Sequence, residues 1–259
     1  MKASLRFTLS LAGTAVLAAL LLLVSGAAAR QRHLTTCKGL EVTILDSLQR
    51  SFVSSQDVKR YMADYGDYIG QRIDSVNLKK VEDLLDGRSA IRKSEAYVTR
   101  DGMLHIDITQ REPAVRFHTG GNGYYADESG FLFPLQSKYT ARVPIIDGAV
   151  PVTVPKGFKG RPEDPKEQLW LDQVLNLIRY ISHDKTFKDA FSQITVLRGG
   201  ELILIPRSGS ERFYFGQPGG FDGKFERIRT YYEAIAPAKA PGTYRSVDVR
   251  YDKQIICRK

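Results

Sequence analysis

The chain has 259 residues, 42% of them hydrophobic, and a formal net charge of +9. This ordinary apolar fraction excludes a disordered chain, because it is sufficient to bury the core of one large or two modest domains. The excess of Lys and Arg favours anionic headgroups or wall polymers over nucleic acid, because the basic residues are scattered without a stacking platform or helix-turn-helix pattern.

Residues 7–29 form a long apolar run, FTLSLAGTAVLAALLLLVSGAAA, that contains no charged side chain. About 23 residues at about 1.5 Å each give a helix of about 35 Å, which crosses a hydrocarbon core of about 30 Å. We therefore expect one transmembrane helix between a cytoplasmic tail, residues 1–6, and a body outside the membrane. The apolar side chains of this membrane anchor include Leu9, Leu17, Leu20, Leu21, Leu22, Leu23 and Val24.

A cleaved signal peptide is the alternative to a retained anchor. Ala27 and Ala29 have the spacing of a cleavage site, and Arg30 follows them. We favour the retained anchor, because the apolar run exceeds the roughly 7–15 residues usual in a signal peptide. An oxidising compartment would permit a disulfide between Cys37 and Cys257, but we do not expect one, because the ends of a two-domain chain need not meet.

After a linker, residues 30–38, the stretch of residues 39–111 predicts the order strand, helix, helix, strand, strand. Residues 39–47 alternate apolar and polar side chains, as a half-buried strand does. Ser54 and Asp57 have the spacing of a capping box, which predicts that the first helix begins there.

The second helix of this domain is expected to begin at Asn77, a good N-cap residue. Residues 95–100 and 104–110 predict two strands around Asp101-Gly102, a pair typical of hairpin turns in which both residues take positive φ. Two helices on one face of three strands would bury one core.

This order of elements resembles a POTRA domain, and three stretches are similar to the bacterial cell-division family FtsQ, called DivIB in Gram-positive bacteria. The stretches are Phe52–Val58, Val81–Leu85 and Ile108–Pro113. The resemblance covers essentially the whole chain and implies a short tail, one membrane helix, a POTRA domain and a β-domain. Only six residues precede the apolar run, so we do not expect the interactions that the family makes through its tail.

Residues 112–259 are predicted to form the β-domain, with mostly antiparallel strands and two helices, so that the whole fold is α+β. The first helix, residues 167–180, is predicted to place Leu169 and Trp170 against the sheet, and residues 221–235 predict the second helix. Short apolar or alternating stretches predict strands at residues 114–117, 124–126, 131–133, 143–146, 193–197, 201–205 and 212–215.

The last stretch predicts a strand around Val247, a tight turn at Asp252-Lys253 and a final strand at residues 254–257. It is similar to the family's C-terminal pattern, in which the last strand is a sheet edge that receives a strand from FtsB (DivIC), itself held with FtsL. An unpaired strand edge suits that role. The resemblance carries the role to Arg250, Tyr251, Lys253, Gln254, Ile255 and Ile256.

The sequence shows no constellation for catalysis or metal binding. The histidines are far apart without HxH or HExxH spacing, and neither cysteine belongs to a CxxC pair. We therefore expect no enzyme, no cofactor and no small-molecule substrate.

The main hypothesis is a single-pass protein of the bacterial inner membrane, enriched at the division septum, that acts as a scaffold of the division machinery. The alternative is a secreted or wall-associated binding protein that uses its basic surface after signal cleavage. A third interpretation concerns the C-terminus alone: it would only complete the β-domain core, with Lys253, Arg258 and Lys259 protecting the edge from aggregation.

Overall fold

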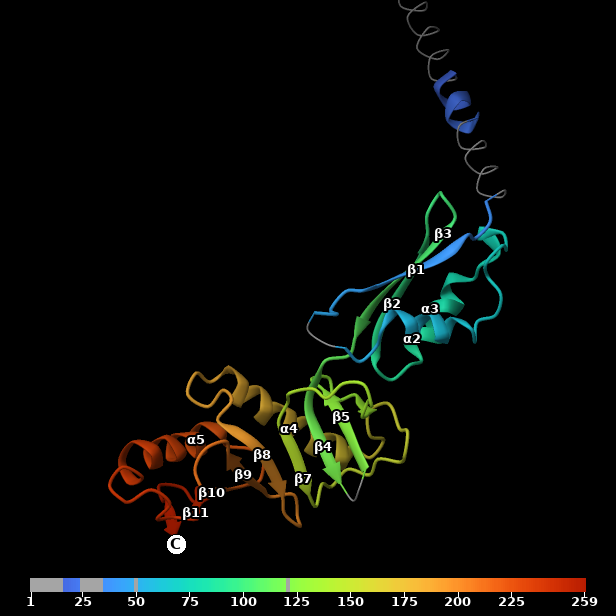
Figure 1. The fold of residues 1–259 in the computed structure, drawn as a ribbon. Helices are drawn as coiled ribbons and strands as arrows, with labels where there is room; N and C mark the ends of the chain where they lie inside the picture. Colours follow the sequence, from blue (N-terminus) through green and yellow to red (C-terminus); the bar gives the residue numbers. More distant parts are fainter. Residues whose placement is uncertain (1–15, 24–34, 49–50, 120–121) are drawn as a thin grey trace, which may run out of the picture. The chain divides into compact units, whose positions relative to one another are not determined.

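The structure is a computed structural model that describes residues 16–23, 35–48, 51–119 and 122–259 (Figure 1). The chain divides into two compact units, the first ending at Gln110 and the second beginning at Arg111. Each unit has its own sheet and its own buried residues. The mixture of helices and strands confirms the α+β class.

Residues 16–23 form a helix, whereas residues 7–15 and 24–29 of the predicted anchor, with Leu9 and Val24, lie outside the described residues. Within the described part of the chain, no helix is both long enough and apolar enough to cross a membrane. The tail, most of the linker and the alanines of the possible cleavage site also lie outside it. The exposed large apolar side chains of this short helix are Val16, Leu17, Leu20, Leu21, Leu22 and Leu23.

The first unit has the predicted order of two helices and three strands. Strand β3 lies between β1 and β2, parallel to β1 and antiparallel to β2. Helices α2 and α3 cover one face of this first sheet (Figure 1), where alternate residues of β3 are buried. The elements are β1 (Gly39–Ile44), α2 (Ser55–Met62), the 3₁₀ turn η1 (Ile73–Ser75), α3 (Leu78–Asp86), β2 (Ile91–Val98) and β3 (Met103–Gln110).

Both predicted helix starts are confirmed. The backbone N–H of Asp57 donates to Ser54 Oγ at 3.3 Å, and the Ser54 N–H donates to Asp57 Oδ2 at 3.1 Å, which completes the capping box. At the start of α3, the N–H of Lys80 donates to Asn77 Oδ1 at 3.0 Å. These local bonds satisfy backbone donors that helix geometry leaves unpaired, so the two helices begin where the sequence predicts.

The turn between β2 and β3 differs in detail from the prediction. Gly102 has a φ of +96°, as expected, but Asp101 is not among the residues with positive φ. The N–H of Gly102 donates to the Thr99 carbonyl at 3.1 Å, and the N–H of Thr99 to the Met103 carbonyl at 3.0 Å. The loop is thus longer than a two-residue hairpin, and only its glycine needs a left-handed backbone.

The second unit contains one large sheet with the strand order β12-β11-β10-β9-β8-β7-β4-β5-β6. Most neighbours are antiparallel, as predicted, but β4–β7, β7–β8 and β10–β11 are parallel pairs. The strands are β4 (Pro113–Thr119), β5 (Asn122–Asp127), β6 (Leu132–Pro134), β7 (Ile145–Gly148), β8 (Phe191–Val196), β9 (Leu202–Pro206), β10 (Arg212–Gly216), β11 (Ser246–Asp248) and β12 (Ile256–Arg258).

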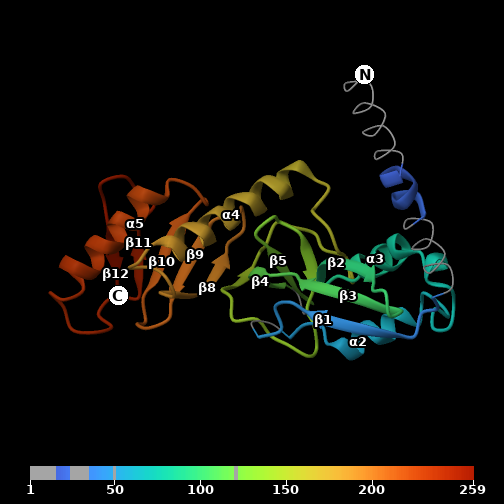
Figure 2. The ribbon, with the colours of Figure 1, turned by 90° about the horizontal axis from the view of Figure 1, so that it is seen from above.

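Helical connections join two of the three parallel pairs, because parallel neighbours need a crossover. Helix α4 (Pro165–His183) joins β7 to β8. Helix α5 (Phe221–Thr230), continued by the π-helical turn η2 (Tyr231–Ile235), joins β10 to β11. Both helices pack on one face of the large sheet (Figure 2), and a single hydrophobic cluster joins them to it.

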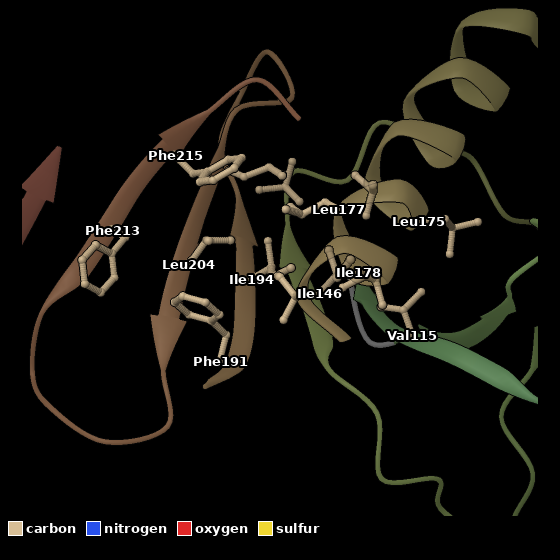
Figure 3. Packing of buried hydrophobic residues seen from close by; sticks show 14 of the residues in the cluster. Val115, Ile146, Leu175, Leu177, Ile178, Phe191, Ile194, Leu204, Phe213 and Phe215 are labelled. Carbon is tan, nitrogen blue, oxygen red and sulfur yellow. The ribbon is translucent and has the colours of Figure 1, made fainter. Parts of the chain in front are cut away.

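Figure 3 shows the middle of this cluster, with Leu177 and Ile178 of α4 beside Ile146 and Ile194 of the sheet. These side chains are almost completely buried. Burial of a large aliphatic side chain contributes about 1.5–3 kcal/mol, so this contact holds α4 firmly on β7 and β8.

Trp170 is buried as predicted, and its indole Nε1 donates to the Gly200 carbonyl at 3.3 Å. The prediction that Leu169 faces the sheet is wrong, since 60% of its surface is exposed. Leu169 shares its helix face with Asp172 and Asn176, at the i+3 and i+7 positions, and that face points to solvent.

Candidate functional site

The predicted site lies at one end of the large sheet, where β12 pairs with β11 (Figure 2). The pair is antiparallel, with Val247 opposite Cys257 and Asp248 opposite Ile256. Among the described strands, none lies on the other side of β12. Its outer edge therefore has backbone N–H and C=O groups with which a further strand can pair.

The opposite end of the large sheet is covered. At β6, the N–H of Leu132 donates to the Gly160 carbonyl at 2.7 Å, and the Gly160 N–H donates back at 3.0 Å. The long loop before α4 thus supplies the hydrogen bonds that a neighbouring strand would make.

In the first sheet, the β2 edge is covered by side chains of α3. The N–H of Ser94 donates to Asp86 Oδ1 at 2.7 Å, and that of Ala96 donates to Glu82 Oε1 at 2.9 Å. Strand β1, the other end of that sheet, receives one long bond from a side chain of α2. Within the described structure, β12 is thus an open sheet end, whereas β6 and β2 are covered.

Strand β11, on which β12 rests, is held by the core. Val247 and Val249 are completely buried, and the N–H of Val249 donates to the Tyr214 carbonyl of β10 at 3.1 Å. From α5, Arg227 Nε donates to the Val249 carbonyl at 3.0 Å. The partner of β12 inside the sheet is therefore a well-fixed strand.

Arg250 stabilises the chain just after β11 through two carboxylates. Its Nε and Nη2 atoms donate to Asp248 Oδ1 and Oδ2 at 3.0 and 2.8 Å, and Nη1 donates to Glu201 Oε2 at 3.2 Å. Burial alone would raise the pKa of Asp248, but the hydrogen bonds from Arg250 outweigh it and hold that pKa below its usual value. The same hydrogen bond raises the pKa of Arg250. Arg250 thus contacts the β9 and β10 side, away from the outer edge of β12.

The turn into β12 forms where predicted. Lys253 has a left-handed backbone with a φ of +57°, and 50% of the Tyr251 surface is exposed. Arg227 Nη1 contacts Asp252 Oδ1 at 3.4 Å, so α5 also contacts the turn. Tyr251, Lys253 and Gln254 all present exposed side chains beside the edge.

The final strand begins later than predicted. It starts at Ile256, because β11 ends at Asp248 and Ile256 is the first residue opposite it. Gln254 and Ile255 bring the chain back from the turn, and Ile255 packs against the hydrophobic cluster. Ile256 lies in the strand, is half-buried and does not belong to that cluster.

Two residues of the edge, Cys257 and Arg258, were missing from the predicted site. Cys257 packs against the core, and burial raises the pKa of its thiol. Arg258 is exposed and lies on the same strand face as Ile256 by the alternation of side chains. The predicted strand, residues 254–257, already contained Cys257, and ending it one residue later would have included Arg258.

The groups at this edge could pair with a further strand. Among the described residues, no group of three or more His, Cys, Asp or Glu side chains could hold a metal ion. The edge offers backbone donors and acceptors, one half-buried isoleucine and several basic side chains. Such an arrangement recognises another strand through main-chain hydrogen bonds.

Two family models match the chain in order. Residues 35–109 match a POTRA-like domain, and residues 112–258 match the model described as FtsQ/DivIB, C-terminal related. No curated protein matches the chain. The second model alone covers more than half of the chain and includes β11 and β12. The chain therefore belongs to the FtsQ/DivIB family, a family of non-enzymatic scaffolds of bacterial cell division.

Proposed function

We propose that this protein is a membrane-anchored scaffold of the divisome that captures a strand of an FtsB/DivIC-like protein, held together with FtsL, at the outer edge of β12. The observation that supports this most directly is the position of β12 at the end of the large sheet, without a covering segment in the described structure. By holding that partner, the scaffold would link early to late division proteins.

Capture would add a strand to the sheet. The partner's backbone would pair with β12, and side chains on alternate positions would contact Ile256 and Arg258. Lys253, Arg258 and Lys259 make the edge basic, which disfavours pairing between two copies of this chain, because like charges would then lie close together. A partner segment with acidic side chains would not meet that repulsion.

The substitution Ile256→Asp tests this capture. It would place a charge on the strand face that the partner contacts, and we expect co-purification of the FtsB/DivIC-like partner to fall by about tenfold or more. The fold should persist, because Ile256 lies outside the hydrophobic cluster.

The matched control is Leu169→Asp, which changes another apolar side chain that is exposed on α4. This variant should retain the partner. Undiminished partner capture by folded Ile256→Asp protein, checked by circular dichroism, would contradict the proposed edge.

The proposed anchor is residues 7–29, with residues 1–6 in the cytoplasm and both units outside. The full chain should then stay in the membrane pellet after alkaline carbonate extraction. Intact mass separates this from the secreted alternative, in which the mature chain would begin at Arg30. A mass that corresponds to cleavage before Arg30 would remove the anchor and leave the β12 proposal untouched.

A further inference from the structure

The second unit has a cleft of about 790 Å³ that is separate from β12. It lies between the C-terminal half of α4 and the amino ends of three strands. The lining residues from these strands are Ala114 of β4, Ile145 of β7 and Phe191 of β8. These three strands are parallel, so their amino ends lie at one edge of the sheet. The volume falls within the range of roughly 300–1,000 Å³ that is usual for binding sites.

The lining combines an apolar floor with a basic rim. Leu175, Ile178 and Phe191 are buried in the floor, and Ile145 is 39% exposed. The rim has four cationic side chains and only two carboxylates, those of Glu128 and Asp189. The cations are Arg142, Arg179, Lys188 and Arg207.

The segment that carries Lys188 is held in place. Asp184 Oδ1 accepts from the N–H groups of Thr186 and Phe187 at 2.7 and 3.1 Å, and the Phe187 side chain is buried. Asp189 follows with a φ of +64°. Lys188 is therefore exposed on a fixed turn.

Two further cations of the rim are also restrained. Arg207 Nε donates to the Asp189 carbonyl at 2.9 Å, and its backbone N–H donates to the Ala190 carbonyl at 2.7 Å. On α4, Arg179 Nη1 donates to Asn176 Oδ1 at 2.7 Å. Restrained side chains lose less conformational entropy when a ligand binds, which favours binding.

We propose that this cleft docks an acidic peptide segment of a partner protein, with an apolar side chain over Ile145 and carboxylates on Arg142, Lys188 and the other cations. The four cations come from four different chain segments, so they suit several carboxylates along an extended ligand better than one compact anion. The apolar floor accommodates a side chain that a free anion lacks. The inference does not depend on the capture at β12. Three strands, β9, β10 and β11, lie between β8 and β12 in the sheet.

The test uses the full chain and a fluorescein-labelled peptide of about 12 residues in which pairs of glutamates flank leucines. Fluorescence anisotropy should show binding, and a peptide with glutamine in place of glutamate should bind about tenfold more weakly or worse. The double variant R142E/K188E should weaken binding of the acidic peptide by about tenfold or more.

The matched control is K156E/K185E, which changes the net charge by the same amount on exposed lysines outside the cleft. Lys185 lies in the same short segment as Lys188. Comparison of the two double variants therefore distinguishes the effect of a residue's position in the cleft from the effect of net charge. The control should bind like the unchanged protein.

Three results would overturn the inference: no binding of the acidic peptide, equal weakening in both double variants, or stronger competition by inorganic pyrophosphate or phosphatidylglycerol vesicles than by unlabelled peptide. The last result would assign the cleft to a phosphate-bearing ligand instead. Failure of capture at β12 would affect none of these measurements.

Discussion

The carboxylate of Asp248 and the guanidinium of Arg250 hold the chain in place between β11 and the turn into β12. The pair is only partly exposed, and Glu201 extends it toward β9. Because Arg250 contacts Asp248 and Glu201 of its own unit, we expect it to position the edge. A partner strand would meet the turn and β12, whose geometry depends on this ion pair.

The substitution Arg250→Ala should destabilise the second unit by about 1–2 kcal/mol at pH 7, because it leaves Asp248 without its main hydrogen-bond donor. The folded-state pKa of Asp248 lies below its ordinary value of 3.8. The stability from this pair is therefore complete above about pH 4 and is lost as the pH falls through the folded-state pKa.

Urea unfolding at pH 7 and pH 3 checks this, and the cost of Arg250→Ala should be smaller at pH 3. Arg198→Ala, at an exposed arginine in the turn after β8, should cost little at either pH. An equal cost of Arg250→Ala at both values would contradict the role of the ion pair.

Gly148, at the end of β7, needs to be glycine for two reasons. Its φ is +88°, and a Cβ there would lie 2.3 Å from the Val196 carbonyl oxygen of β8. Gly199 also has a positive φ, +92°, but a Cβ there would meet no atom within 4 Å. Gly148→Ala should therefore destabilise the protein by about 3 kcal/mol or more, and Gly199→Ala by about 1 kcal/mol. Thermal unfolding of the two variants side by side measures the difference in stability. Equal losses of stability would show that backbone strain alone, and not the contact with Val196, determines the cost.

At the level of elements, the sheet ends differ in how they are closed. A loop covers β6, two α3 carboxylates cover β2, and β12 stays open in the described structure. Edge strands invite unwanted pairing, so each closed end prevents association at that place. In the large sheet, association with another strand is therefore directed to the β12 end in the described structure.

Removal of the α3 carboxylates should open the β2 edge. Glu82→Ala together with Asp86→Ala leaves the N–H groups of Ser94 and Ala96 without these acceptors, at a cost of about 1–3 kcal/mol. We also expect self-association, measured by light scattering. Asp83→Ala is the control, because Asp83 pairs with Lys79 on the exposed side of the same helix. A double variant as monodisperse and stable as this control would show that the carboxylates do not guard the edge.

At the level of the whole molecule, two neighbouring residues belong to different units. Gln110 accepts from the Val53 N–H at 2.8 Å and donates to Asp46 Oδ1 at 3.0 Å, within the first unit. Arg111 Nη1 donates to Asp127 Oδ2 at 2.7 Å, within the second. Each unit therefore has its own attachment at the junction.

The substitutions Gln110→Ala and Arg111→Ala should each destabilise one unit, by about 1–3 kcal/mol. Hydrogen exchange of the full chain, read by mass spectrometry, should show lower protection in residues 35–110 for the first variant. For the second, protection should fall in residues 111–259. Reduced protection in both units from either change would mean that the chain unfolds as a single cooperative body.

Features set by neighbouring residues could be predicted from the sequence. The Ser54–Asp57 capping box and the Asn77 cap depend on side chains within three positions of the backbone they bind, so the pattern contains them. Leu169 was misplaced because its apolar character was given more weight than the helical period, which groups it with Asp172 and Asn176 on the solvent face. The start of β12 was misplaced because it depends on the length of β11.

Features that join distant residues were beyond the sequence. The cover of β2 by Glu82 and Asp86 needs the helix position on the sheet, and nothing in their spacing signals it. The parallel pairing of β10 with β11 and the basic cleft likewise follow from topology. For the proposed site, the residue pattern predicted the segment that forms the final strand. The position of that strand at the edge of the sheet was expected from the family resemblance alone.

Because β11 runs parallel to β10, the chain must travel along α5 and return before residue 246 can join the sheet. If secretion threads the chain from its N-terminal side, β4 to β10 emerge before the strands that would hold the partner. A polypeptide whose translation stopped before β11 would then contain most strands of the domain but lack the strand that binds the partner. Capture of the partner would in this way require that β11 and β12 have been synthesised.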